Sequence, residues 1–344
     1  MATPHLAQHP NVGELPVEDT DAAKAKAIVV KAGVGLITYP LTFSKTLFQL
    51  GFEPYPLSTG KVFLIAGRDA YFLPNALKYI RNVYTDFGLA ALYRGAEAGV
   101  VGTVLGGFAS HYAEKYLDTY YPDVGGRKDN LDKKDDELTN YESFRVHLRY
   151  AIRLSISTTV GVAVTHPFTV VMVREIAQHI GGESKYTNVL FSLLRVGDEE
   201  GLPGLYSGIV PMLIASFVRT WGIAALGFAA NRLLLKAEKE ATDQDGRDAV
   251  KSLRKYTPLL IPFTVNAFSY PFEVCSTVFA VVGSHLAVSM LPYSPGFHHW
   301  SDTYDFLKPT GGLARGARLF LREHKGAVNV GADHSLYASN KYFV

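Results

Sequence analysis

Charged side chains lie inside long apolar stretches of this 344-residue chain. Lys45, Arg219 and Glu273 each interrupt or follow a run of apolar residues. A charge in such a position usually faces a bundle interior or a water-filled cavity, where it pairs with another polar group. The chemistry that these residues predict is therefore ion pairing and the passage of polar groups, with no bond made or broken.

Enzymatic chemistry finds little support in the residue types. No nucleotide-binding glycine loop follows a strand-like segment. His298 and His299 are adjacent, but Asp302 and Asp305 make a weak ligand set beside them, and the single cysteine, Cys275, adds no metal-ligand cluster. We expect no enzymatic activity, no cofactor and no metal.

The composition is that of a chain with apolar segments. Apolar residues make up 48% of the chain and charged residues 19%, which is below the roughly 25% of soluble domains. The net charge of +2 gives no strong field for nucleic acid. Nucleic acid is therefore excluded as a partner, and membrane lipid is expected as one.

Three triplets of a hydroxyl residue, a ring and a proline fall inside apolar stretches. They are Thr38-Tyr39-Pro40, Thr165-His166-Pro167 and Ser269-Tyr270-Pro271. Proline inside a helix removes a backbone hydrogen bond and kinks the helix, which membrane helices tolerate better than water-exposed ones. The recurrence predicts an internal repeat of kinked membrane helices, with Pro40, Pro167 and Pro271 at the kinks.

Five apolar stretches of the chain are long enough to cross a bilayer, which takes about 20 residues. The five stretches are residues 25–50, 96–117, 150–180, 208–235 and 256–290. Glycines spaced three or four apart in the second stretch, from Gly95 to Gly107, predict close helix packing. Two shorter amphipathic pieces, Phe63 to Tyr84 and Tyr186 to Val196, predict helices that lie along the membrane surface.

The division of the chain follows from these stretches. Residues 1–22 hold no lysine or arginine and predict a disordered tail without targeting chemistry. A single membrane domain is expected over residues 23–326, and residues 327–344 are expected to form a polar tail. Its parts are a first repeat (23–117), a charged linker (118–145), a second repeat (146–235), a second linker (236–255) and a truncated third repeat (256–326).

A second motif follows the proline helices. In the first repeat four residues separate Gly88 from Tyr93-Arg94-Gly95. In the second repeat four residues separate Glu200-Gly201 from Tyr206-Ser207-Gly208. Together the two motifs resemble the signature of the mitochondrial carrier family over roughly residues 25–320. The resemblance implies three repeats of two tilted helices around a central cavity.

The departures from the family pattern are informative. Carriers place an acid two residues and a base five residues after each proline. The acidic positions here hold Thr42, Thr169 and Glu273, and the basic positions hold Lys45, Met172 and Ser276. A pair between Lys45 and Glu273 is the single ion pair that these positions allow. The third turn is shortened to Gly312–Gly316, and no run after it could cross a bilayer, so we expect five spans and no sixth helix.

Local strings are similar to those of the mitochondrial carrier homolog branch: Leu50–Pro56, His179–Tyr186 and Pro292–Pro295. That resemblance implies the mitochondrial outer membrane, insertion of α-helical proteins, tail-anchored ones among them, and docking of an apoptotic BH3-type regulator. The sequence alone leaves the inner membrane open. The alternatives are a receptor or scaffold for such regulators and, with less support, a solute antiporter.

A bundle without its sixth helix predicts a laterally open, hydrated polar groove that receives client helices. The residues assigned to this substrate groove are Lys45, Ser216, Arg219, Glu273, Tyr270, His166 and Arg174. Other roles stay open for five of them. His166 and Tyr270 also suit packing into their kinks. Arg174 and Arg219 also suit extension toward the membrane surface, Arg219 with a phosphate as its partner, and Lys45 also suits a structural pair with Glu273.

Overall fold

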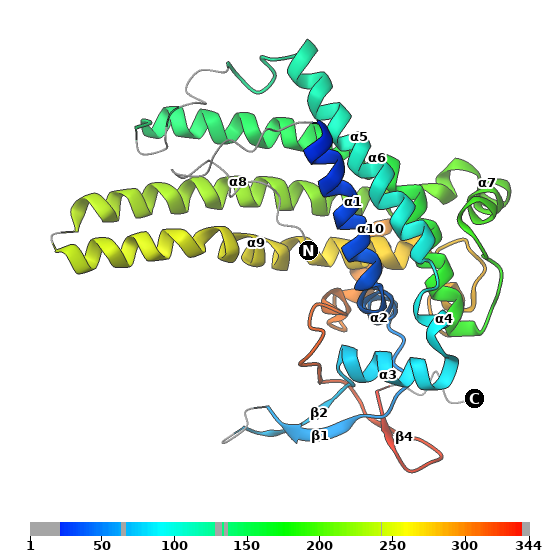
Figure 1. The fold of residues 1–344 in the computed structure, drawn as a ribbon. Coiled ribbons are helices and arrows are strands. Elements are labelled where there is room, and N and C mark those ends of the chain that lie inside the picture. Colours follow the sequence, from blue (N-terminus) through cyan, green and yellow to red (C-terminus); the bar gives the residue numbers. More distant parts are fainter. Residues whose placement is uncertain (1–20, 63–66, 128–132, 134–136, 242, 339–344) are drawn as a thin grey trace. The chain divides into compact units, whose positions relative to one another are not determined.

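The computed structural model describes residues 21–62, 67–127, 133, 137–241 and 243–338 (Figure 1). The chain divides into two compact units, each assembled from three sequence segments. The first unit comprises Met1–Lys31, Val104–Val164 and Met212–Tyr270. The second unit comprises Ala32–Thr103, Thr165–Pro211 and Pro271–Val344. Two of the division points fall at predicted kinks, directly before Thr165 and directly before Pro271.

Helices cover the predicted apolar stretches. They are α1 (Asp21–Ile37), α2 (Tyr39–Leu50), α5 (Ala96–Tyr120), α6 (Asn140–Gly181), α8 (Ile209–Glu240) and α9 (Gln244–Ala280). Residues 1–20, most of the predicted disordered tail, lie outside the described residues, and Asp21 already begins α1. The last predicted stretch is too long, because α9 ends at Ala280 and turns follow it.

The number of membrane spans is only partly supported. Among the described residues α6 and α8 are long and apolar enough to cross a membrane, and the bent pair α1 and α2 makes a third if it counts as one span. Glycines and hydroxyl residues lower the hydropathy of α5, and charged residues fill the first half of α9. Five spans, and a carrier-like arrangement of their repeats that is open on one side, stay predictions.

The first proline triplet breaks its helix, whereas the other two lie inside continuous helices. α1 and α2 meet at Thr38 with a bend of 68°, and Pro40 occupies the first turn of α2, where its missing N–H costs nothing. The Thr38 hydroxyl donates to the carbonyl of Val34 at 2.9 Å. Pro167 and Pro271 lie within α6 and α9.

The charged linkers are shorter than predicted. α8 continues to Glu240 and α9 begins at Gln244, so the linker 236–255 is wrong as a solvated loop. Its Ala, Glu, Lys and Leu residues favour helix strongly, and Lys236 pairs with Glu240 at 3.7 Å, one turn away. In the first linker, α5 extends to Tyr120 and α6 begins at Asn140; residues 128–132 and 134–136 lie outside the described residues.

The second unit also contains short helices and strands. The helices are α3 (Ala76–Phe87), α4 (Leu89–Leu92), α7 (Val189–Leu205) and α10 (Trp300–Leu307), with 3-10 turns at Ala287–Ser289 and Gly312–Ala314. Figure 1 shows α3 beside α2 and α4. Its buried Tyr79 and Val83 share a core with Phe43 and Leu47 of α2.

A small sheet replaces part of a predicted surface helix. β1 (Ser58–Lys61), β2 (Asp69–Phe72) and β3 (Glu323–His324) form an antiparallel sheet in that order, with Tyr71 opposite His324. The helix predicted over Phe63 to Tyr84 is therefore wrong before Ala76, and residues 63–66 lie outside the described residues. Asn75 caps α3 by accepting from the Lys78 N–H at 2.8 Å.

The described residues after Gly316 form strands and no helix. β3 lies in this segment, followed by the pair β4 (Asn329–Val330) and β5 (Leu336–Tyr337). The region predicted as a polar tail therefore has structure over residues 329–337, and residues 339–344 lie outside the described residues. The segment joins the second unit, because the Leu73 N–H donates to the Arg322 carbonyl at 2.9 Å.

Glycines permit close approach along α5, as predicted. A Cβ on Gly102 would lie 2.8 Å from the Phe168 Cβ within the second unit. A Cβ on Gly107 would lie 2.9 Å from Ile28 within the first unit. Larger side chains at either position would force the packed helices apart.

Candidate functional site

Lys45 and Glu273 meet, as the motif positions indicate. The Lys45 ammonium lies 3.8 Å from the Glu273 carboxylate, and the side chains are 24% and 21% exposed. One turn along, the Thr277 hydroxyl donates to the Gln49 amide oxygen at 3.1 Å. Both contacts join α2 to α9 within the second unit, so they form a row of polar contacts between these two helices.

The His166 side chain is buried directly before Pro167 in α6. The ring is 2% exposed, its Nε2 lies 2.9 Å from the Ser207 carbonyl oxygen, and it stacks on Tyr206 with the centroids 6.2 Å apart. Such a ring holds a turn in place and offers no surface to a client. Packing is therefore the role that the geometry gives His166, and the structure does not support its placement in an open groove.

Tyr39 makes the same pair of contacts in the first repeat. Its hydroxyl donates to the Arg94 carbonyl at 2.7 Å, and its ring stacks on Tyr93 at 6.1 Å. The ring residue before the proline thus binds the carbonyl just before the glycine that ends the turn. The first two triplets therefore connect their proline helices to the glycine turns, a role that the sequence did not reveal.

The turns themselves require glycine. A pair of glycines with positive φ recurs three times: Gly88 and Gly95, Gly201 and Gly208, and Gly311 and Gly316. A Cβ on Gly95 would lie 2.9 Å from the Met172 carbonyl oxygen, and one on Gly208 would lie 2.6 Å from that of Ser276. Met172 and Ser276 stand at the basic positions of the carrier motif, so each of these turns packs against the proline helix of the following repeat.

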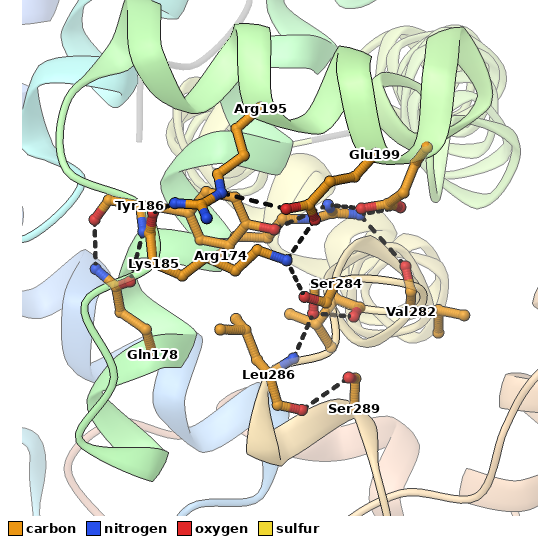
Figure 2. A network of polar contacts seen from close by, with 12 residues as sticks. Arg174, Gln178, Lys185, Tyr186, Arg195, Glu199, Val282, Ser284, Leu286 and Ser289 are labelled. Carbon is orange, nitrogen blue, oxygen red and sulfur yellow. Dashed lines mark hydrogen bonds and ion pairs between the residues drawn. The ribbon is translucent and has the colours of Figure 1, made fainter.

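Arg174 lies at the centre of an enclosed polar network (Figure 2). Its side chain is fully buried, and its guanidinium forms a bidentate ion pair with Glu200 of α7. It also donates to the carbonyl of Ala280 at 2.9 Å and of Val282 at 3.3 Å. The prediction that Arg174 extends toward the membrane surface is wrong, and an enclosed ion pair cannot line an open groove.

The network continues to the surface through Lys185. Its ammonium pairs with Glu199 and donates to the Ser284 carbonyl at 2.8 Å, while Arg195 donates to Glu199 at 3.2 Å. Figure 2 shows these side chains gathered between α7 and the segment after α9. The hydrogen bonds from Arg174 and Lys185 to the carbonyls of Ala280, Val282 and Ser284 therefore tie the second repeat to the third.

Arg219 lies on α8 in the first unit and contacts α9. Its side chain is half-buried, and Nε donates to the Asn266 amide oxygen at 3.2 Å. Ser216 and Tyr270, also assigned to the groove, are half-buried in the same unit. Sequence reasoning missed Asn266, although an amide inside the apolar run from Leu259 to Phe268 was a visible signal.

The seven predicted groove residues therefore divide between the units. Lys45, Glu273, His166 and Arg174 belong to the second unit, and Ser216, Arg219 and Tyr270 belong to the first. A common groove lined by both sets stays a prediction.

The adjacent His298 and His299 help to begin α10. Their backbone N–H groups donate to the Asp302 carboxylate in the first turn of that helix.

Comparison with known proteins agrees with the motifs. Residues 148–234 match the mitochondrial carrier protein family. Mitochondrial carrier homolog 2 of Homo sapiens is 28% identical over 306 residues, which cover 88% of this chain and 95% of the relative. The chain is therefore similar to the mitochondrial carrier homologs over most of its length. Mitochondrial carrier homolog 1 of Mus musculus is 27% identical over 314 residues, covering 89% of this chain and 78% of that protein. Similarity to these proteins implies a mitochondrial membrane as the location of this chain.

Proposed function

We propose that the chain is an insertase that places α-helical proteins, tail-anchored ones among them, into the mitochondrial outer membrane. The observation that carries this proposal is the Arg219–Asn266 contact, which puts polar groups between two largely apolar helices. A charged side chain at the bilayer centre costs about 2.5–3.5 kcal/mol on insertion scales. Water or a polar client segment beside Arg219 would reduce that cost.

An exposed apolar face adjoins this contact on α9. It consists of Tyr256, Leu259, Leu260 and Phe263, whose exposed fractions range from 52% to 80%. Asn266 lies seven residues after Leu259, which places the two side chains on the same side of the helix. In the proposed mechanism an apolar client helix lies on this face while its polar terminus passes Arg219 and Asn266.

The third repeat supports an open side. Where a carrier repeat continues into its second helix, residues 317–338 form strands β3 to β5 instead. Without that helix the face of α9 is available to a client and to lipid. In this mechanism insertion requires no covalent chemistry. The Arg219–Asn266 contact lowers the free-energy barrier for the client's polar terminus to cross the bilayer, and the client's apolar helix moves from the face of α9 into the lipid.

The test uses the purified full-length protein in liposomes and a tail-anchored substrate with a protease-protected tag. We expect insertion at least about threefold faster than in protein-free liposomes, and a large part of that gain lost in R219L. K236Q, which removes an exposed charge from the same helix, serves as the matched control and should keep the gain. Equal rates with and without protein would overturn the proposal.

The same liposomes test the antiporter alternative. Carriers close their cavity with a ring of ion pairs, whereas the motif positions here hold only the Lys45–Glu273 pair. Exchange of a trapped solute by a protein that fails to insert clients would favour an antiporter. Capture of a BH3-type regulator by such a protein would favour a receptor.

A further inference from the structure

A row of exposed tyrosines follows the C-terminal half of α5 in the first unit. Tyr112, Tyr116 and Tyr120 are spaced four residues apart, which puts them on one side of the helix. Together with Tyr121, which follows the helix, they form the tyrosine row, and their exposed fractions range from 52% to 66%. A continuous exposed aromatic surface of this kind marks a site of interaction.

The rings contact one another along the row. The Tyr116 ring centroid lies 4.8 Å from that of Tyr120 and 5.9 Å from that of Tyr121. Toward the middle of α5, Tyr112 stacks on Phe108 with the centroids 6.4 Å apart. The surface therefore changes along the helix, from a phenylalanine without a polar group to tyrosines with hydroxyl groups.

The charged residues between the tyrosines face a different neighbour. Lys115 lies 2.5 Å from Asp21 of α1, and Glu114 lies 3.5 Å from Lys24 of the same helix. These pairs turn the charged side of α5 toward α1 within the first unit. The tyrosine row occupies another side of α5, so its exposed surface is mainly aromatic.

The level of the row relative to a membrane follows from α6, which is long and apolar enough to span one. Residues 154–173 of α6 contain no Asp, Glu, Lys or Arg, and about 20 such residues cross the hydrocarbon core. Arg153 directly precedes this run. Its guanidinium pairs with Asp118 of α5 at 2.6 Å and donates to the Tyr121 carbonyl at 3.0 Å. The two contacts place the tyrosine row beside the end of the apolar run of α6.

The sequence of α5 changes at the same level. Residues 98–110 contain no Asp, Glu, Lys or Arg, whereas Glu114, Lys115 and Asp118 follow them. The tyrosine row begins just after the uncharged part. Tyrosine is enriched at this boundary in membrane proteins, because its ring suits the apolar side and its hydroxyl group suits the polar side.

We propose that the tyrosine row lies in the headgroup layer of the membrane and anchors the first unit there. The rings contact the upper part of the acyl chains, and the hydroxyl groups bind lipid oxygens or water. Interfacial tyrosines help to set the tilt and rotation of membrane helices. The row needs neither a client nor the Arg219–Asn266 contact, so the proposal is independent of insertase activity.

The first experiment measures the depth of Tyr116 with the full-length protein in liposomes. The buried Cys275 is removed by C275S, and a fluorescent label is attached in turn to Y116C, V164C or K251C. Val164 is exposed near the middle of the apolar run of α6, and Lys251 is exposed in the charged half of α9. Lipids with a spin label near the headgroup or deep in the acyl chain quench the fluorescence, and iodide quenches it from water.

The shallow spin label should quench position 116 at least about twofold more than the deep one, because tyrosine prefers the interface. The order should reverse at position 164. Position 251 should respond to iodide and to neither lipid.

A second experiment tests anchoring. Y112S/Y116S/Y120S removes three rings but keeps hydroxyl groups, and the label at V164C reports the depth of α6. The ratio of shallow to deep quenching there should change at least about 1.5-fold, because the tilt of the helices is no longer fixed by the row. Y112W/Y116W/Y120W keeps interfacial rings and should leave the ratio unchanged. Unchanged elution of both variants shows that they fold.

Four results would overturn the proposal. Quenching of position 116 by iodide and by neither lipid would place the row in water. Stronger quenching there by the deep spin label would place it in the hydrocarbon core. Protection from all three quenchers would show that protein covers the row. An equal ratio at V164C in the serine variant and its parent would show that the row does not anchor the unit.

Discussion

Arg174 is fully buried and forms a bidentate ion pair with Glu200. Removing one member of a buried ion pair costs about 3–5 kcal/mol, because the other charge stays without compensation. R174M should therefore lower the melting temperature strongly in detergent. R174M/E200Q should recover part of the loss, since neither charge then remains. Equal melting temperatures for R174M and the wild type would contradict the role assigned to the pair.

Glu199 makes part of the same network sensitive to acid. Its hydrogen bond with Lys185, helped by Arg195, lowers the pKa of the Glu199 carboxyl below its ordinary value of 4.5. A carboxyl with a lowered folded-state pKa stabilises the fold above its unfolded pKa, and the contribution is lost as the pH falls through the folded-state value.

The melting temperature of E199Q should therefore fall less than that of the wild type between about pH 5 and pH 3. E240Q removes a largely exposed carboxylate and should follow the wild-type curve. Parallel curves for E199Q and the wild type would show that Glu199 does not contribute to acid sensitivity.

Sequence reasoning worked best at this scale where residues share a motif. The positions after the prolines predicted the Lys45–Glu273 contact, which is observed across 228 residues of chain. The partner of Arg174 was missed because it comes from a separate helix, although Glu200 precedes the turn glycine Gly201. Burial of an arginine depends on what packs around it, and that is a tertiary property.

At the scale of elements, the glycine turns impose the strictest local condition. Gly208 has φ of 81°, and a Cβ there would collide with the Ser276 carbonyl. G208A should destabilise the protein by about 2 kcal/mol or more, through strain and displacement of α9. G227A, in the helix α8 that follows Gly208, has no neighbouring atom within 4 Å of the added Cβ and should be neutral or slightly stabilising.

Melting temperatures of the two glycine variants provide the comparison. Equal values would show that the turn adapts to a side chain.

The sequence predicted most of the helices, because a long apolar stretch with helical spacing is a local signal. The sheet was not predicted, because β2 and β3 pair across about 250 residues of chain. A strand of two residues, such as β3, also leaves no periodic pattern.

At the scale of the whole molecule, residues after Gly316 hold the second unit together. Arg322 forms a bidentate ion pair with Glu53, donates to the Pro74 carbonyl at 2.8 Å and lies 3.4 Å above the Phe48 ring centroid. R322A should release strands β3 to β5, so that a protease cleaves residues 317–338 at least about tenfold faster, as followed by mass spectrometry. R318A, at an exposed position nearby, should resist like the wild type.

The carrier signature predicted three related segments and a departure in the third, and those expectations rest on motifs within each segment. The sequence could not predict that the chain after the third turn would complete a sheet with the first repeat. The Arg322–Glu53 ion pair joins the same two segments, and a contact between residues so far apart leaves no pattern in either local sequence.

This contact also sets an order of events during synthesis. Glu53 and Arg322 are 269 residues apart, so Glu53 must wait for nearly the entire chain to be made before its charge is paired. Closing so long a loop is slow compared with forming local helices. Until Arg322 and β3 have been made, Glu53 lacks this ion-pair partner and β2 lacks the neighbouring strand on that edge.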